Sequence, residues 1–178
     1  DLSPIFENRE AWNKAYREAE EAVAKLPELE NTLKVSPQQM RAGLDRIYQT
    51  MQRVERVYLY ASLLKNSDNG DGEYQRMEGM ATNLYVAMST ACAFVDPEIL
   101  SMPEETLLQF LDTADLAPYR HILGDVNRAR AHTLDAAGEK MLAMLSDAAD
   151  TADNCFTMLE SVDMEFPKIR DEAGQEVQ

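Results

Sequence analysis

Cysteine and histidine are nearly absent from this sequence, which has two of each among 178 residues. Two cysteines, Cys92 and Cys155, are too few for a disulfide framework, and the apolar run around Cys92 indicates a small core residue. His121 and His132 both lack the glutamate three residues earlier that a di-iron carboxylate bundle requires. We therefore expect structural or solvated roles for both histidines.

Long apolar runs and clusters of basic residues are also missing. No stretch of about 18 consecutive apolar residues occurs, so we expect no segment to span a membrane. The chain has 17 basic against 32 acidic residues, a net charge of -15. Nucleic acid and anionic membrane surfaces are therefore poor partner candidates. We interpret the acid excess as a solvated surface, with a site for cations or basic peptides as the alternative.

The motifs of the common catalytic classes do not occur either. We find no HExxH, GxSxG, GxGxxG, P-loop or CxxC pattern. We therefore assign no catalytic residue, no cofactor-binding residue and no metal ligand in this chain, and we expect it to be inactive alone. The sequence has no signal peptide, which favours a cytoplasmic location. Because it begins at Asp1 rather than at methionine, a signal upstream of Asp1 stays open.

One long helix is the clearest feature that the sequence does have. Ser36 and Gln39 form a capping box, and Pro37 stands at the first helical position. Apolar residues then recur in steps of four and three, which predicts a helix over 36–66. A helix of this length needs partners along most of it. The expected buried stripe consists of Met40, Leu44, Ile47, Met51, Val54, Tyr58 and Ala61.

Further helices are predicted on both sides of this one. A turn-forming cluster, NSDNGDG, separates it from a second long helix over 73–95, so the two should be antiparallel neighbours. Asp96–Pro97 should kink or break that second helix. The sequence predicts an all-α fold, an antiparallel bundle of long helices with shorter ones. The other predicted helices cover 8–26, 103–112, 118–130, 133–149 and 152–162.

The last sixteen residues change character. MEFPKIRD alternates like a strand, EAGQ is typical of a turn, and QEVQ begins a return strand. We therefore predict a helical lobe over 1–162, then a first strand, a turn and a partial second strand over 163–178. A hairpin truncated in its second strand leads us to expect a longer protein.

Two stretches are candidates for binding. Ser67, Asn69, Asp71 and Glu78 approach the spacing of a calcium loop between two helices, but a serine replaces the first carboxylate. A turn followed by an acid-rich helix start explains the same residues, so the calcium site is not favoured. The tyrosine-rich run 57–60 suggests either core packing or a binding surface, because tyrosine has an apolar body and a polar tip.

The ordered series of segments resembles the N-terminal region of the oligoendopeptidase F family, thimet-oligopeptidase-like zinc metallopeptidases. No single segment is specific, but all occur in the family's order and together cover nearly the whole chain. They are DLSPIF followed by Trp12, then RVYLYASLL, FVDPEIL with MPEETL, APYRHIL, HTLDAAGEKMLAML and FPKIRDEAGQEV.

This resemblance implies a helical, non-catalytic lobe that forms one wall of a channel for short peptides. It implies zinc in the parent enzyme, held by an HExxH motif and a later glutamate in a C-terminal catalytic lobe, which would be the main partner. None of that motif occurs here, so no zinc ligand is carried over. The alternative hypothesis is an independent helical adaptor that binds partner helices. An HExxH further along the reading frame would decide between the two.

Overall fold

The computed structural model describes residues 2–133 and, beyond them, residues 138, 151–152, 155–156, 159, 164, 169–170 and 172–177. The chain divides into two compact units, Asp1–Arg130 and Ala131–Gln178, and each is considered by itself. Residues 2–133 contain helices and no strand, so the predicted all-α class is confirmed for this part. None of the helices in the described residues is long and apolar enough to cross a lipid bilayer.

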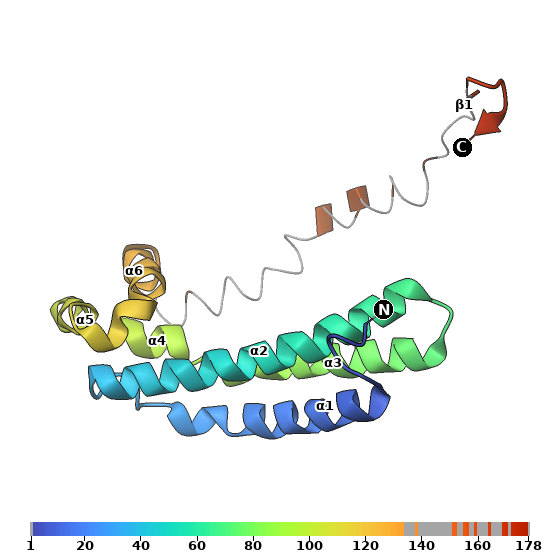
Figure 1. The fold of residues 1–178 in the computed structure, drawn as a ribbon. Coiled ribbons are helices and arrows are strands. Elements are labelled where there is room, and N and C mark those ends of the chain that lie inside the picture. The colour runs from blue at the N-terminus through green and yellow to red at the C-terminus, as the bar shows by residue number, and fades with distance from the viewer. Residues whose placement is uncertain are drawn as a thin grey trace. The chain divides into compact units, whose positions relative to one another are not determined.

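Three helices run side by side through most of the first unit (Figure 1). Helix α1 covers Arg9–Ala24, followed by the short 3-10 helix η1, Leu26–Leu29. Helix α2 covers Pro37–Ser67, and α3 returns antiparallel to it over Gly72–Ala91. The predicted cap of α2 is confirmed, because the Ser36 hydroxyl accepts a hydrogen bond from the backbone N–H of Gln39 at 3.2 Å.

The predicted end of the second long helix was wrong. Helix α3 ends at Ala91, and a separate helix α4, Val95–Leu100, begins before Asp96–Pro97. Pro97 lies in the first turn of α4, where its missing N–H removes no helical hydrogen bond. The break therefore falls at residues 92–94. Periodicity did not show it, because Val95 continues the apolar spacing of α3.

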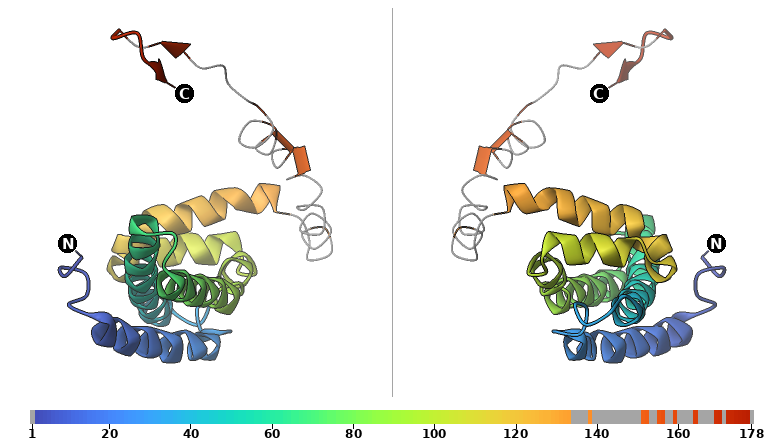
Figure 2. Two further views of the ribbon diagram at one scale, coloured as in Figure 1. Left: turned by 90° about the vertical axis from the view of Figure 1, so that its right-hand side faces the viewer. Right: turned by 90° about the vertical axis from the view of Figure 1, so that its left-hand side faces the viewer.

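Short helices gather at the end of the unit where α2 begins and α3 ends (Figure 1). They are α4, α5 (Glu104–Leu111), the 3-10 helix η2 (Ala114–Tyr119) and α6 (Arg120–Ala129). A further 3-10 turn, η3, covers Arg130–His132. The end-on views show α6 on the side of α2 and α3 away from α1 (Figure 2).

The larger hydrophobic core lies between α1, α2 and α3. Trp12 of α1 is fully buried, and its indole N–H donates to the backbone carbonyl of Val57 at 2.9 Å. Tyr60 is also buried here, with its ring edge-on to Phe6 at 5.4 Å between centroids. The other buried members of this core are Ala19, Val23, Leu26, Ile47, Val54, Val57, Ala61, Met77, Ala81, Leu84 and Met88.

A second hydrophobic core joins the start of α2 to the short helices. Met40 and Leu44 of α2 belong to it, although they lie on the same stripe as the residues that fill the first core. The predicted stripe is thus buried or half-buried throughout, divided between two cores. The remaining buried members of the second core are Ile99, Met102, Leu107, Leu111, Leu116 and Leu123.

The buried carboxylate of Glu98 holds the connector between η1 and α2. Its two oxygens accept backbone N–H groups of Asn31 and Leu33, at 2.7 and 2.8 Å. Asn31 adopts the left-handed backbone conformation, with φ of 65°, which asparagine tolerates better than most residues. Leu33 then lies so close to Gly43 of α2 that a Cβ on Gly43 would be 2.4 Å from a Leu33 methyl carbon.

In the second unit, strand β1 (Ile169–Arg170) pairs antiparallel with β2 (Glu176–Val177). Gly174, between the two strands, has φ of 79°, which favours glycine. Much of the predicted hairpin over 163–178 lies outside the described residues, as do most of the helices predicted over 133–149 and 152–162. The boundary at 162–163 and the longer hairpin stay predictions.

The buried stripe of α3 can be tested by substitution. Leu84 is 3% exposed in the first core, so Leu84→Ala should lower the free energy of unfolding by roughly 2–5 kcal/mol. Val86 is on the same helix and 58% exposed, so Val86→Ala should change it by less than about 0.5 kcal/mol. Denaturant melts give both values, and equal losses would show that α3 packs through another face.

Candidate functional site

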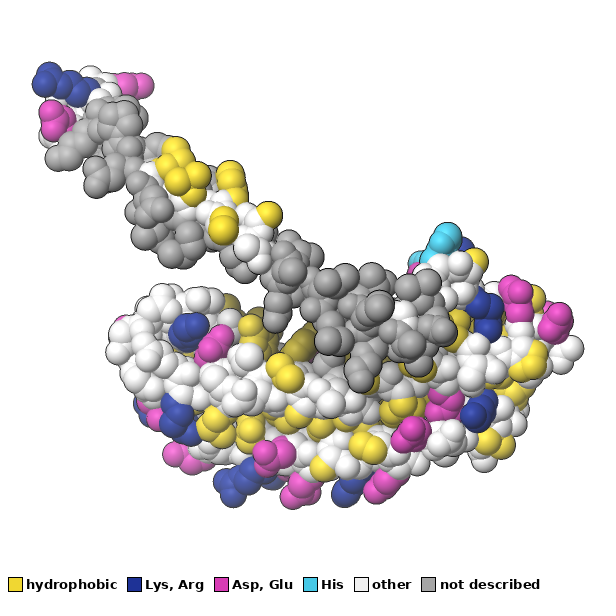
Figure 3. Space-filling view, turned by 180° about the vertical axis from the view of Figure 1, so that it is seen from behind, with side chains coloured by type: hydrophobic (Ala, Val, Ile, Leu, Met, Phe, Trp, Pro, Cys, Tyr) yellow, Lys and Arg dark blue, Asp and Glu magenta, His cyan; other side chains and the backbone are white. Residues whose placement is uncertain are grey.

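A groove of about 390 Å³ opens between α2, α3, α4 and α6, all within the first unit. We call it the tyrosine groove. Its lining is mostly apolar, as is usual for sites that bind small molecules or peptide side chains. Seen from behind, apolar side chains run along the middle of the helical unit, and charged side chains gather at its lower edge (Figure 3). The groove is lined by Leu44, Ile47, Tyr48, Met51, Tyr85, Met88, Ser89, Cys92, Ala93, Val95, Asp96, Ile99, Ile122, Leu123 and Val126.

Two pairs of aromatic rings position the tyrosines of this groove. Tyr48 of α2 stacks on Tyr119 with ring centroids 5.4 Å apart, and Tyr85 of α3 packs on Tyr58 at 5.9 Å. Tyr85 is 47% exposed, so part of its ring is free to contact a ligand. Tyr48 and Tyr85 therefore each pack on a second tyrosine ring that does not itself line the groove.

A polar cluster behind Tyr48 fixes the Tyr119 ring. The Tyr119 hydroxyl donates to one oxygen of Asp45 at 2.6 Å, and the Arg41 guanidinium donates to the other at 2.7 Å. Arg41 also donates to the backbone carbonyl of Asp115 at 3.0 Å and lies over the Tyr119 ring, 5.4 Å from its centroid. These contacts join α2 to η2, so the stacked pair is held from both elements.

The same contacts shift the protonation equilibria of the cluster. The hydrogen bond from Tyr119, together with Arg41, lowers the pKa of Asp45 below its usual value. Burial, with the hydrogen bond to Asp45, raises the pKa of Tyr119 to about 12. Asp45 is thus held ionised and Tyr119 neutral across the physiological range, as the donor–acceptor geometry requires.

Asp96 provides the negative charge of the groove lining. Burial, and to a lesser extent the charge of Asp96, raise the pKa of Tyr48. Cys92 is half-buried in the lining, and burial raises the pKa of its thiol. Since the thiolate is the reactive form, this cysteine is a poor nucleophile at neutral pH. The groove therefore offers apolar contact, tyrosine hydroxyls and one carboxylate, an arrangement suited to binding.

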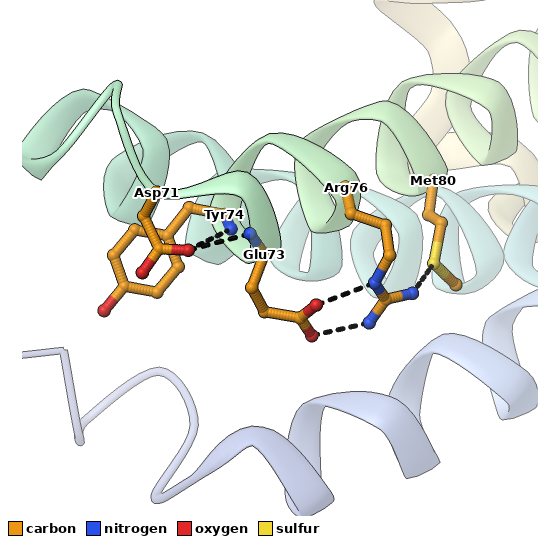
Figure 4. Close-up of polar contacts among 5 residues, drawn as sticks. All are labelled: Asp71, Glu73, Tyr74, Arg76 and Met80. Atoms are coloured by element: carbon orange, nitrogen blue, oxygen red, sulfur yellow. Dashed lines mark hydrogen bonds and ion pairs between the residues drawn. The ribbon is translucent and has the colours of Figure 1, made fainter.

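The residues of the calcium-loop candidate take part in local contacts. Asp71 caps α3, and its carboxylate accepts the backbone N–H groups of Glu73 and Tyr74 at 2.7 and 3.2 Å (Figure 4). The Ser67 hydroxyl donates to the Leu64 carbonyl, and the Asn69 carbonyl accepts from Gln75. Glu78 lies 3.6 Å from Lys65. These contacts cap α3, close the turn before it and join α3 to the end of α2.

The other sequence candidates lie apart from one another. His121 is exposed beside Asp125, with 3.6 Å between ring nitrogen and carboxylate, and His132 is exposed at the end of η3. Tyr60 fills the first core, whereas Tyr58 supports the groove tyrosine Tyr85. Across the described residues, no three His, Cys, Asp or Glu side chains are arranged to hold a metal ion.

Comparison with known proteins identifies the relatives of this fold. A family model described as Oligopeptidase F matches residues 98–166. The chain is 34% identical over 178 residues to oligopeptidase PepF of Bacillus subtilis, and 29% identical over 179 residues to group B oligopeptidase PepB of Streptococcus agalactiae. The chain matches the N-terminal domain of the oligopeptidase F family. The family resemblance seen in the sequence is thereby confirmed.

A solved structure supports the same relationship. The crystal structure of oligoendopeptidase-F from Enterococcus faecium matches 96% of this chain with a TM-score of 0.66 and 27% sequence identity. This chain corresponds to 34% of that structure, and it spans 27% and 30% of the two curated relatives. The sequence resemblance implies zinc in the parent enzyme. The described residues contain no group of three His, Cys, Asp or Glu side chains that could hold a metal ion, so we assign no zinc ligand among them.

The Asp45 cluster gives a titration test. In Tyr119→Phe the hydroxyl that contributes most to the lowered pKa of Asp45 is lost, so that pKa should rise toward 3.8, the usual value for an aspartate side chain. A lowered folded-state pKa contributes stability above the unfolded pKa, and this stability is lost as pH falls through the folded pKa. The wild-type protein should therefore lose more stability than the variant as pH falls from about 5 through the folded-state pKa of Asp45.

Carboxyl-carbon NMR against pH measures the Asp45 pKa directly, and denaturant melts measure the stability. Tyr85→Phe is the matched control, since it removes a groove hydroxyl from a residue outside the Asp45 cluster. An unchanged Asp45 titration in Tyr119→Phe would show that the hydroxyl does not hold this carboxylate.

Proposed function

We propose that this chain is the non-catalytic N-terminal lobe of a zinc oligopeptidase, and that it shapes the access of short peptides to an active site elsewhere in the protein. The observation that carries the proposal is the extent of the PepF match. It covers 99% of this chain but only 27% of that oligopeptidase. A helical part of this size leaves most of the parent protein for the catalytic machinery.

The tyrosine groove supports a role in contacting peptides. Its apolar lining can receive a peptide side chain, while the hydroxyl groups of Tyr48 and Tyr85 can bond to the peptide backbone. Asp96 would favour a positively charged group beside that side chain. Because the tyrosine rings are already packed on partner rings, binding a peptide would order few additional side chains.

The alternative, an independent helical adaptor, would also use an exposed apolar groove. The ordered match to oligopeptidases over nearly the whole chain favours the lobe of a peptidase. For the parent protein we propose a cytoplasmic zinc metalloendopeptidase, with short peptides and its own catalytic lobe as the partners of this chain. The zinc and the catalytic residues belong to that other lobe.

The role of the groove can be tested in the full-length protein by one charge substitution. Ile122 lines the groove and is 43% exposed, so Ile122→Glu should leave the fold intact and place a carboxylate in an apolar lining. For short peptides with apolar side chains we expect KM to rise by about fivefold or more, the equivalent of roughly 1 kcal/mol of lost binding. Zinc content should stay unchanged.

Leu108→Glu provides the matched control. Leu108 on α5 is 47% exposed and lies outside the groove lining, so the same change of charge and size should leave KM unaltered. Steady-state kinetics with matched apolar and polar peptides, together with metal analysis, complete the experiment. Equal KM values in the two variants would show that the groove takes no part in the access of peptides to the active site.

A further inference from the structure

A second groove, of about 590 Å³, lies between α1 and α2. Its α2 wall carries Arg46, Gln49, Arg53 and Arg56, and the small residues Ala15 and Ala22 of α1 lie in its lining. We call it the arginine groove. Residues 46, 49, 53 and 56 recur at helical spacing, so they form one stripe along α2. At about 1.5 Å per residue this stripe is roughly 15 Å long.

The charge of the arginine groove is opposite to that of the whole chain. Its lining contains four basic side chains, three arginines and Lys25, against two acidic ones, Glu18 and Glu21. The complete chain carries a net charge of -15. The lining therefore has an excess of positive charge in an otherwise acidic protein, with Arg46 paired to Glu28 just outside it, and this concave surface would attract an anionic partner.

The three arginines are held differently. Arg56 donates to the backbone carbonyl of Ile5 and lies over the Phe6 ring, 4.7 Å from its centroid. Arg46 donates to Glu28 and to the carbonyl of Lys25, both at 3.1 Å. Arg53 lies between them, exposed, with no side-chain partner in the described part of the chain. Two fixed guanidinium groups thus flank one that is available.

We propose that the arginine groove binds an extended acidic segment of polypeptide. Guanidinium groups bind carboxylates through paired, charge-assisted hydrogen bonds, and an extended chain advances about 3.3 Å per residue. About four to five residues would therefore span the stripe, with carboxylates reaching Arg53 and its neighbours. The proposal is independent of the peptidase function, because the arginine groove and the tyrosine groove lie on different faces of α2.

The experiment measures binding of fluorescent hexaglutamate to the full-length protein, with hexalysine and diglutamate as comparison peptides. Hexaglutamate should bind, with an affinity that falls as salt screens the charges. Hexalysine should not displace it, and diglutamate should bind at least about tenfold more weakly because it cannot span the stripe. Equal affinity for diglutamate and hexaglutamate would overturn the proposal in favour of a site for single anions.

Two matched pairs of variants assign the binding to this groove. Arg53→Gln and Gln49→Glu should each weaken hexaglutamate binding by about fivefold, the scale of one exposed charge interaction. Their controls have the same chemistry outside the groove lining, Arg17→Gln on α1 and Gln109→Glu on α5. Both controls should change the affinity by less than about twofold. Equal effects in variants and controls would mean that only net charge matters and would overturn the proposal.

Discussion

Helix α2 contributes to two hydrophobic cores at once, and the arrangement of the first unit depends on this. Its first turns pack with the short helices, through Met40 and Leu44, and the rest packs between α1 and α3. At 31 residues it is roughly 45 Å long. Because a single packed helix is stiff, α2 fixes the position of the short helices relative to α1 and α3. The tyrosine groove lies where these two sets of elements meet.

Polar contacts between distant segments complete this arrangement. Glu98 joins α4 to the connector before α2, and Asp45 joins α2 to Tyr119 at the end of η2. Both carboxylates receive two hydrogen bonds, and for the buried Glu98 these offset the cost of removing the charge from water. Glu98 and Asp45 do not line the tyrosine groove, but they hold α4 and α2, which form two of its walls. The shape of the groove is therefore set partly by core residues that also line it, such as Leu44 and Ile99, and partly by these hydrogen bonds outside the lining.

The sequence predicted the features that are encoded locally. The capping residue Ser36, the spacing of the apolar stripe and the turn before α3 each depend on neighbouring residues, and the structure confirms them. The extension of the second long helix to residue 95 was wrong, because Val95 keeps the helical spacing after the helix has ended at Ala91.

The contacts that build the candidate site could not be predicted in this way. Asp45 and Tyr119 are 74 positions apart, and Glu98 lies more than 60 positions from the amides that it binds. No local pattern signals such partners. Tyr48 and Tyr85 carry no local signal either, because each packs on a ring from another element. The basic residues of the arginine groove are separated along the sequence and come together only through the helical spacing of α2, so they form no cluster in the sequence itself.

The central claim, that this chain is a lobe contacting peptides bound by the parent protein, is tested most directly by photocrosslinking. A short, non-cleavable peptide with a photoreactive apolar side chain would be bound to the full-length protein, irradiated, and its adducts mapped by mass spectrometry. The account predicts adducts on residues that line the tyrosine groove, such as Met51, Met88 and Ile122. Adducts confined to sequence beyond residue 178, or to exposed apolar residues outside the groove such as Leu108, would contradict it.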